Sequence, residues 1–173
     1  IIVKFPTTAV GVRVMEEATY RGVNVNATVS FSVPQAVAAG EAVERGLKRR
    51  EAEGLRVDDM GPVITVMMGR LEDWLRLQTE RDAIIADPTA LPWSGVAVFK
   101  RTVEEFERRG LRARPLGAAI RHHLHWSELI GGDVIITLPS SWQRRFNASD
   151  VEVRPRMDDP VDPRIVDDLS RHF

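Results

Sequence analysis

The feature that most constrains the fold is a regular alternation of short apolar runs with longer amphipathic segments. We expect the apolar runs to be strands, at residues 1–5, 23–31, 63–68, 114–120 and 134–138. We expect the amphipathic segments to be helices, at residues 9–21, 34–52, 94–109, 126–130 and 162–171. Strands that alternate with helices are typical of a parallel sheet with crossover helices. The sequence therefore predicts an α/β fold in which residues 1–173 form a single domain.

One stretch departs from this alternation. Residues 76–93 lie between the third predicted strand and the helix predicted at 94–109, and they contain Pro88 and Pro92. Proline interrupts helices and strands, because it lacks an N–H donor and fixes one backbone angle. We therefore expect an irregular insertion or lid there.

Composition excludes several classes of function. The net charge of −1 gives the chain no general attraction for nucleic acid or for anionic membranes, so we expect neither as a partner. The chain has no cysteine, which excludes disulfides, thiolate metal sites and thiol catalysis. No run approaches the roughly 18 apolar residues of a membrane span. The reducing cytoplasm is the expected location.

Lys4 interrupts the first apolar run, Ile1–Phe5. Moving an ammonium group out of water disfavours its charged form. A neutral lysine amine can attack a carbonyl carbon and form a Schiff base. The alternative is a terminal strand whose lysine reaches water through its long aliphatic stem. The first eleven residues leave both interpretations open.

The first 36 residues resemble two segments of the transaldolase family. The Schiff-base lysine segment of that family is matched by Ile1, Val3, Lys4, Pro6, Thr8 and Gly11. Phe5 and Val10 depart from the pattern. Residues 22–36 are similar to the family segment Gly-aliphatic-x-x-Asn-x-Thr-Leu-x-Phe-Ser-x-x-Gln-Ala. The resemblance is specific here and looser in the rest of the chain.

The resemblance implies a catalytic group of three residues. Lys4 would form the Schiff base, Asn26 would bind substrate hydroxyls, and Thr28 would hold the catalytic water. Independently of the resemblance, the spacing places Asn26 and Thr28 on the same side of the predicted strand, because residues two apart on a strand point to the same side. Inside a barrel, polar side chains need partners or contact with substrate. Such a reaction requires neither a metal nor a cofactor.

Two arginines are candidates for binding a substrate phosphate. Residues 63–70 resemble the family segment Ile-Ser-Pro-Phe-Val-Gly-Arg and end on Arg70, with Thr65 in the serine position. Residues 116–121 resemble Met-Gly-Ala-Ser-Phe-Arg and end on Arg121, but Ala119 replaces a phosphate-binding serine. Each arginine follows a predicted strand, and the fixed donors of guanidinium suit phosphate. Thr65 and Ser30 are further candidates for substrate contact.

Length limits how much of a barrel the chain can form. A complete (β/α)8 barrel has about 250 residues, whereas this chain has 173. We expect a partial (β/α)8 TIM barrel of about five β/α units, strands four to eight, with the three N-terminal units missing. The proton-shuttling acids of the family belong to the first and third strands, so we expect this segment alone to be inactive. A second copy, or the missing N-terminal segment, is expected to cover the sheet edges.

For the intact protein, the resemblance implies a transferase that moves a dihydroxyacetone unit between sugar phosphates, as in the pentose phosphate pathway. Two alternatives stay open. One is a Schiff-base aldolase that cleaves a ketose phosphate. The other is a barrel fragment that binds sugar phosphates without catalysis.

A histidine cluster suggests a metal site, but less strongly. His122, His123, His125 and Glu128 are close in sequence, and three of them have helical spacing that could bind zinc. Histidines beside Trp126 at a junction of strand and helix are more often hydrogen-bonded structural residues. We therefore expect no metal.

Overall fold

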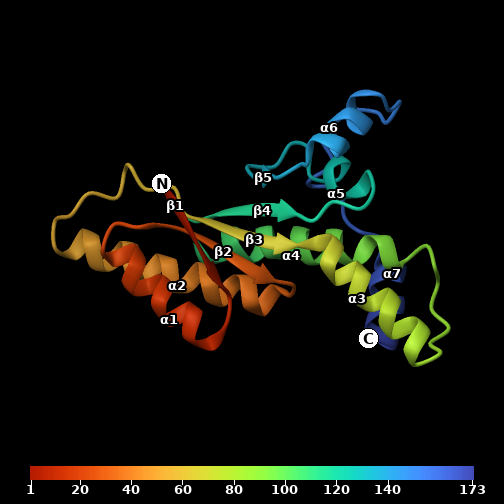
Figure 1. Ribbon diagram of the computed structural model, residues 1–173, viewed down its shortest axis with the longest axis horizontal. Coiled ribbons are helices and arrows are strands. Elements are labelled where there is room, and N and C mark those ends of the chain that lie inside the picture. The colour runs from red at the N-terminus through yellow and green to blue at the C-terminus, as the bar shows by residue number, and fades with distance from the viewer. The chain divides into compact units, whose positions relative to one another are not determined.

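The computed structural model describes all 173 residues and contains one five-stranded sheet (Figure 1). The strands follow the chain order β1-β2-β3-β4-β5. Their bounds are β1 Ile2–Pro6, β2 Asn24–Ser30, β3 Val63–Met67, β4 Arg114–Ala118 and β5 Ile135–Ile136. β1 pairs in parallel with β2, and β2 with β3. This order lacks the reversal of a doubly wound sheet and agrees with consecutive β/α units of a partial barrel.

Seven α-helices and one short 3-10 helix connect and follow the strands. Their bounds are α1 Ala9–Tyr20, α2 Val33–Ala52, α3 Met68–Arg81, η1 Leu91–Trp93, α4 Ser94–Arg109, α5 Leu124–Ser127, α6 Ser140–Asn147 and α7 Pro163–His172. Capping residues in the sequence determine where α1 and α2 begin. The Thr8 hydroxyl accepts a 3.0 Å hydrogen bond from the Gly11 N–H and caps α1. Ser32 and Gln35 form a capping box at the start of α2. None of these helices is long and apolar enough to cross a membrane.

Most elements lie where the sequence predicts them, with three differences. The segment expected to be irregular from residue 76 is helical as far as Arg81, where it continues α3. This helix was not predicted, because it starts directly after β3 without a turn or a side-chain cap that would mark its start. Helix α6 was not predicted at all. The last strand has only two residues, where the sequence predicted five. Which of the eight strands of a barrel these five represent stays a prediction.

The chain divides into two compact units. The first unit comprises residues 1–66 and 101–116, and the second comprises residues 67–100 and 117–173. The division runs through α4 and β4, so the expectation of a single domain stays a prediction.

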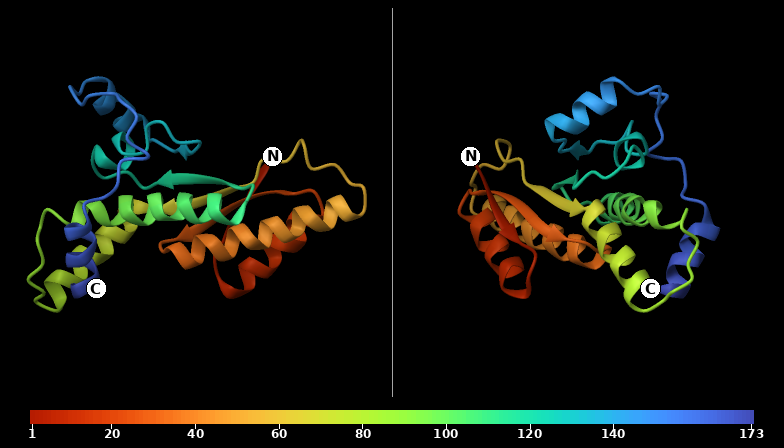
Figure 2. Two further views of the ribbon diagram at one scale, coloured as in Figure 1. Left: turned by 180° about the vertical axis from the view of Figure 1, so that it is seen from behind. Right: turned by 45° about the vertical axis from the view of Figure 1, so that its right-hand side comes forward.

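In the first unit, α1 and α2 lie on the same face of β1 and β2 (Figure 2). The core between them is fully buried and includes Met15, Val25 and Val43. The two helices approach closely at Gly46, where an added Cβ would lie 2.6 Å from the Glu16 carbonyl oxygen. A side chain at this position would separate the helices.

In the second unit, the core forms around Met68 of α3, Phe99 of α4 and Leu129, all at most 1% exposed. Lys100 links the C-terminal segment to this core through hydrogen bonds. Its Nζ donates 2.7 Å hydrogen bonds to the carbonyl oxygens of Arg156 and Asp159. Oε2 of Glu128 lies 3.4 Å from the same Nζ, so the buried ammonium is both paired with a carboxylate and hydrogen-bonded, as a buried charge requires.

β1 is an edge strand with an apolar surface beside it. Ile2 and Val3 on β1 and Val10 and Val14 on α1 are between 41% and 61% exposed. Val10 and Val14, with Ala18 and Val23, also line a groove whose other lining residues are the charged Arg13, Glu17 and Arg21. The predicted uncovered edge is therefore present at β1, and it has the apolar character that a neighbouring β/α unit would bury.

Candidate active site

Three of the predicted site residues lie at matching positions on neighbouring strands. In the register of β1 and β2, Lys4 is opposite Asn26, and Pro6 is opposite Thr28. Residues opposite one another in a parallel sheet point to the same face, and so do residues two apart on one strand. Lys4, Asn26 and Thr28 therefore share one face of the first unit, as the sequence predicted.

Thr65 joins this group from β3. Its hydroxyl donates a 2.7 Å hydrogen bond to Oδ1 of Asn26. Thr65 is only 4% exposed, whereas Asn26 is half-buried. Because Oδ1 is engaged, the Nδ2 amide of Asn26 is the group free to donate to a substrate oxygen. Thr65 thus orients Asn26.

Lys4 is exposed, so of the two interpretations that the sequence left open, the structure has the lysine that reaches water. The reason is its position on the edge strand: β2 lies on one side of β1, and no strand of this chain lies on the other. A lysine on an uncovered edge keeps its ammonium in water. A covering element beside β1 would be needed to desolvate the amine.

The end of β2 departs from regular strand geometry. The pairing of β2 with β3 shifts register between Ala27 and Ser30, and Val29 has φ of 60°. A β-branched residue rarely adopts this left-handed conformation, and such strain often occurs at functional sites. Past the irregularity, Ser30 is fully buried and its hydroxyl lies 2.8 Å from that of Thr7. Ser30 is thus hydrogen-bonded within the chain, and its contact with substrate stays a prediction.

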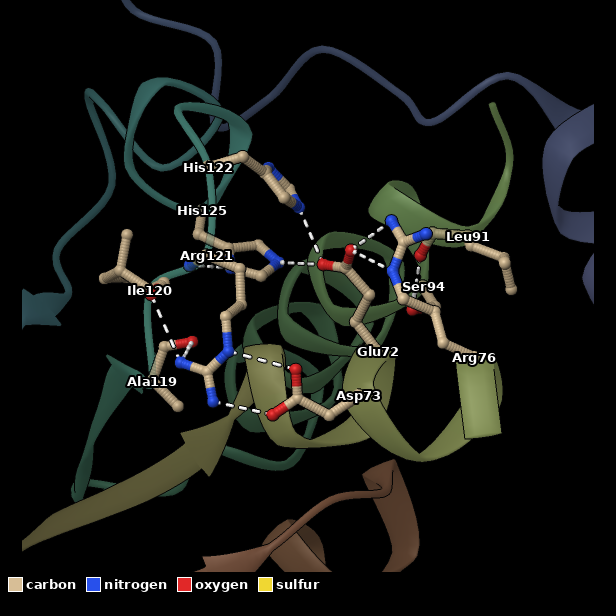
Figure 3. A network of polar contacts seen from close by, with 10 residues as sticks. All are labelled: Glu72, Asp73, Arg76, Leu91, Ser94, Ala119, Ile120, Arg121, His122 and His125. Atoms are coloured by element: carbon tan, nitrogen blue, oxygen red, sulfur yellow. Dashed lines mark hydrogen bonds and ion pairs between the residues drawn. The ribbon is translucent and has the colours of Figure 1, made fainter. Parts of the chain in front are cut away.

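The two predicted phosphate-binding arginines both lie near the Asp73 carboxylate of the second unit, and Figure 3 shows the pairing of Asp73 with Arg121. Arg121 holds Asp73 in a bidentate pair, with Nε 3.0 Å from Oδ1 and Nη2 2.6 Å from Oδ2. Nη1 of Arg70 lies 3.8 Å from the same Oδ2. The hydrogen bond from Arg121 holds the pKa of Asp73 below its ordinary value, so this carboxylate is charged at neutral pH. The two guanidinium groups therefore converge on an anion.

Gly69 allows this convergence. A Cβ added to Gly69 would lie 1.9 Å from the carbonyl oxygen of Ala119 and 2.7 Å from Cγ of Arg121. The first turn of α3 therefore packs directly on the loop that follows β4. In this loop Ala119 has φ of 62°, a strained conformation for a residue other than glycine. The strain lies two residues before Arg121.

Glu72 ties the same loop to α3 beside the arginine pair (Figure 3). His122 Nε2 lies 2.7 Å from Oε2 of Glu72, and Arg76 donates to Oε1 at 2.6 and 3.0 Å. Burial alone would raise the pKa of Glu72. The hydrogen bonds from His122 and Arg76 outweigh burial and lower this pKa to about 2. The carboxylate is therefore ionised and accepts from both neighbours.

His125 completes a group of three potential metal ligands with Glu72 and His122. Burial and the nearby charge of His122 lower the pKa of His125 to about 3, so its ring is neutral. Nδ1 of this ring accepts a 3.2 Å hydrogen bond from the backbone N–H of Arg121, which places the ring proton on Nε2, facing Glu72. Binding of a metal ion at Nε2 would require the ring proton to move to Nδ1. There it would face the Arg121 N–H, and the hydrogen bond between them would be lost. The hydrogen bonding therefore favours a structural cluster over a metal site.

Two members of the histidine cluster predicted from the sequence lie elsewhere. Glu128 lies 3.4 Å from Nζ of Lys100 and 3.8 Å from Nε of Arg156, so it belongs to the ion pairs that hold the C-terminal segment. His123 is exposed and contacts the Ser127 hydroxyl at 3.3 Å. The carboxylate that the histidines do contact, Glu72, lies 50 residues earlier, a distance that local spacing cannot reveal.

Comparison with known proteins decides the family. A sequence model described as transaldolase/fructose-6-phosphate aldolase matches residues 1–170. The chain belongs to this family. It is also similar to a transaldolase of Acidobacterium capsulatum, with 26% identity over 158 residues, which cover 91% of the chain and 40% of the relative. The chain thus spans about two fifths of the length of that curated relative.

The acidic partners of the predicted site residues were not predicted from the sequence. Asp73 follows Arg70 by three residues, a spacing at which side chains on a helix are neighbours. The signal was hidden because the segment after residue 68 was not predicted to be helical. Glu72 and Gly69 were missed for the same reason.

Proposed function

We propose that the intact protein is a transaldolase-type transferase that moves a dihydroxyacetone unit between sugar phosphates through a Schiff base on Lys4. Membership of the transaldolase/fructose-6-phosphate aldolase family supports this reaction class. The single observation that carries the assignment of residues is the register of β1 and β2. It puts an amine, at Lys4, beside an amide, at Asn26, on the same face.

In the proposed reaction, the neutral Lys4 amine adds to the carbonyl carbon of a ketose phosphate. Loss of water gives a protonated imine. This cation then accepts the electron pair of the bond between the α and β carbons when that bond breaks, while the hydroxyl on the β carbon loses its proton to a base and becomes the carbonyl of the departing aldose phosphate. The enamine left on Lys4 attacks an acceptor aldose phosphate, and water releases the product and restores the amine.

Asn26 and Thr28 assist this chemistry in the proposal. The Nδ2 amide of Asn26 donates to a substrate hydroxyl, because its Oδ1 is occupied by Thr65. Thr28 is half-buried and lies opposite Pro6 on the neighbouring strand, and it holds the water that is lost and regained. Both roles require only polar contacts at fixed positions on a rigid strand.

Arg70 and Arg121 bind the substrate phosphate in this proposal. Support comes from their convergence on Asp73, which shows that both guanidinium groups can reach one anion. Ala119, in place of the family's serine, removes one hydroxyl donor. That loss costs about 1 kcal/mol of phosphate affinity.

We further propose that three more β/α units complete the barrel and supply the proton-transferring acids. The apolar edge at β1 and α1 supports this, and so does the fact that the matched relative is longer than the chain. A strand paired with β1 would desolvate Lys4 and raise the fraction of neutral amine at a given pH.

Product analysis tests the proposal and separates its alternatives. The intact protein is supplied with fructose 6-phosphate, with and without an aldose phosphate acceptor. A transferase forms a new ketose phosphate only with the acceptor, and Lys4→Arg abolishes this. Release of free dihydroxyacetone at the same rate without acceptor identifies an aldolase. Binding of the ketose phosphate without any product identifies a binding protein and contradicts the proposal.

A further inference from the structure

The feature that carries a further inference is the carboxylate of Asp73 at the meeting point of two guanidinium groups. It occupies one full edge of Arg121, because Nε and Nη2 both donate to it. Nη1 of Arg121 contacts the carbonyl oxygens of Ala119 and Ile120, each at 3.3 Å. Arginine has five N–H donors. Only one N–H of Nη2 is left without one of these partners.

This arrangement means that Arg121 already holds an anion. The same Asp73 oxygen that contacts Nη2 of Arg121 lies nearest to Arg70. Arg121, Asp73 and Arg70 are 34%, 42% and 60% exposed, so a dissolved anion can reach all three. An incoming ligand must therefore compete with a carboxylate for the bidentate edge of Arg121.

Because of this competition, a ligand binds only if its attraction to the two arginines exceeds that of the Asp73 carboxylate. A ligand with one negative charge replaces a carboxylate of equal charge, and the attraction to the two arginines does not increase. A phosphate monoester carries up to two negative charges near neutral pH and has three strong acceptor oxygens. Its exchange for Asp73 strengthens the attraction to both arginines. The freed carboxylate then returns to water, where an exposed ion is well solvated.

We infer that Asp73 is an internal competitor that sets the affinity threshold of the Arg70–Arg121 pair: dianionic phosphate monoesters displace it, and monoanions bind too weakly to do so. This inference rests on the proposed phosphate site and goes further, because it names the residue that an incoming anion must displace. The cost of displacing Asp73 is the same for every ligand, so removing its charge is expected to tighten the binding of dianions and monoanions alike.

Titration calorimetry of the full 173-residue chain at pH 7.5 tests this with two probes. Glycerol phosphate is dianionic at this pH, and dimethyl phosphate is a monoanion. For Asp73→Asn, we expect affinity for glycerol phosphate to rise about tenfold, as for removal of a competing charge-assisted pair. We also expect the affinity for dimethyl phosphate to rise by a similar factor, because each ligand is spared the same cost of displacing Asp73. Asp73→Ala, which introduces no amide, should behave alike.

A matched control removes the same charge elsewhere on the chain. Asp82 forms a similar bidentate pair with Arg81, with contacts of 2.7 and 2.6 Å, and is also 41% exposed. Asp82→Asn should leave both affinities unchanged. Thermal melting of each variant establishes that it is folded.

The outcomes separate this inference from the phosphate site itself. If Arg121→Ala does not weaken binding of glycerol phosphate, the proposed phosphate site is wrong, and the role of Asp73 fails with it. If Arg121→Ala weakens binding but folded Asp73→Asn binds glycerol phosphate equally or less tightly, the site stands. In that case Asp73 positions Arg121 instead of competing for it, and the inference is overturned.

Discussion

The hydroxyl of Thr65 donates a 2.7 Å hydrogen bond to Oδ1 of Asn26, across neighbouring strands β3 and β2. This contact determines which end of the Asn26 amide faces the open side of the sheet. An amide without such a partner could rotate and present its oxygen. The orientation of the proposed substrate donor therefore depends on a buried residue of another strand.

Thr65→Val keeps the shape of the side chain and removes its hydroxyl. We expect the free energy of unfolding to fall by about 1 kcal/mol, because Oδ1 of the half-buried Asn26 loses its partner. Urea denaturation of the chain measures this. Thr65→Ser is the control, since it keeps the hydroxyl. Equal stability of the valine variant and the wild type would show that the hydrogen bond does not hold Asn26.

Gly69→Ala tests the close packing of α3 on the loop that carries Arg121. Its Cβ would lie 1.9 Å from a backbone oxygen, so α3 and the loop must move apart. We expect destabilisation of about 1–3 kcal/mol, as for overpacking, together with weaker binding of glycerol phosphate. The control is Gly61→Ala, where an added Cβ meets nothing within 4 Å. A Gly69 variant as stable as the control would contradict the packing described here.

The buried histidine predicts acid sensitivity. His125 has a pKa of about 3 in the folded chain, against an ordinary value of 6.5. Between these pH values the unfolded chain binds a proton that the folded chain does not, so stability falls as pH falls from 6.5 toward 3. The slope approaches about 1.4 kcal/mol per pH unit. Glu72, with its pKa lowered from 4.5 to about 2, adds a loss in the same direction only below pH 4.5.

Urea denaturation at several pH values between 6.5 and 4.5 isolates the contribution of His125. His125→Asn keeps an acceptor near the Arg121 N–H but cannot take up a proton in this range. The variant is expected to be less stable at pH 7 and to lose less stability on acidification. The same slope in both proteins would mean that His125 is not held neutral.

The apolar edge at β1 predicts a surface that a partner element covers. Val10 and Val14 are 61% and 42% exposed, so replacing both with lysine should leave the fold of the chain intact. In the intact protein the same double change should abolish activity, because two charges would be buried against the covering unit. Val153→Lys, at a 68% exposed position, is the control. Full activity of the double variant would show that nothing packs on this edge.

The sequence predicted what depends on local patterns. Apolar runs located four strands well, and the cap at Thr8 and the capping box at Ser32 explain why α1 and α2 begin where they do. The polar residues at 26 and 28 could be placed on one face because strand periodicity is strict. For Lys4, in contrast, the sequence left a desolvated and a solvent-exposed side chain both open. Its exposure depends on which strands lie beside β1, which no local pattern contains.

The charged partners of the site could not be predicted for a similar reason. Asp73 meets Arg121 across 48 residues, and Glu72 meets His122 across 50. These pairs exist because Gly69 lets α3 touch the loop after β4, a consequence of tertiary packing. Sequence spacing instead grouped the histidines with Glu128, which packing directs toward Lys100.

The most direct test of the central proposal is to trap the Schiff base on Lys4. The intact protein is incubated with fructose 6-phosphate, reduced with borohydride, digested and analysed by peptide mass spectrometry, with Lys4→Arg as the control. Arginine keeps the charge but cannot form the imine, because guanidinium stays protonated. We predict a reduced sugar adduct on the peptide that contains Lys4, and none in the variant. An adduct on another lysine, or normal turnover of Lys4→Arg, would contradict the proposed mechanism.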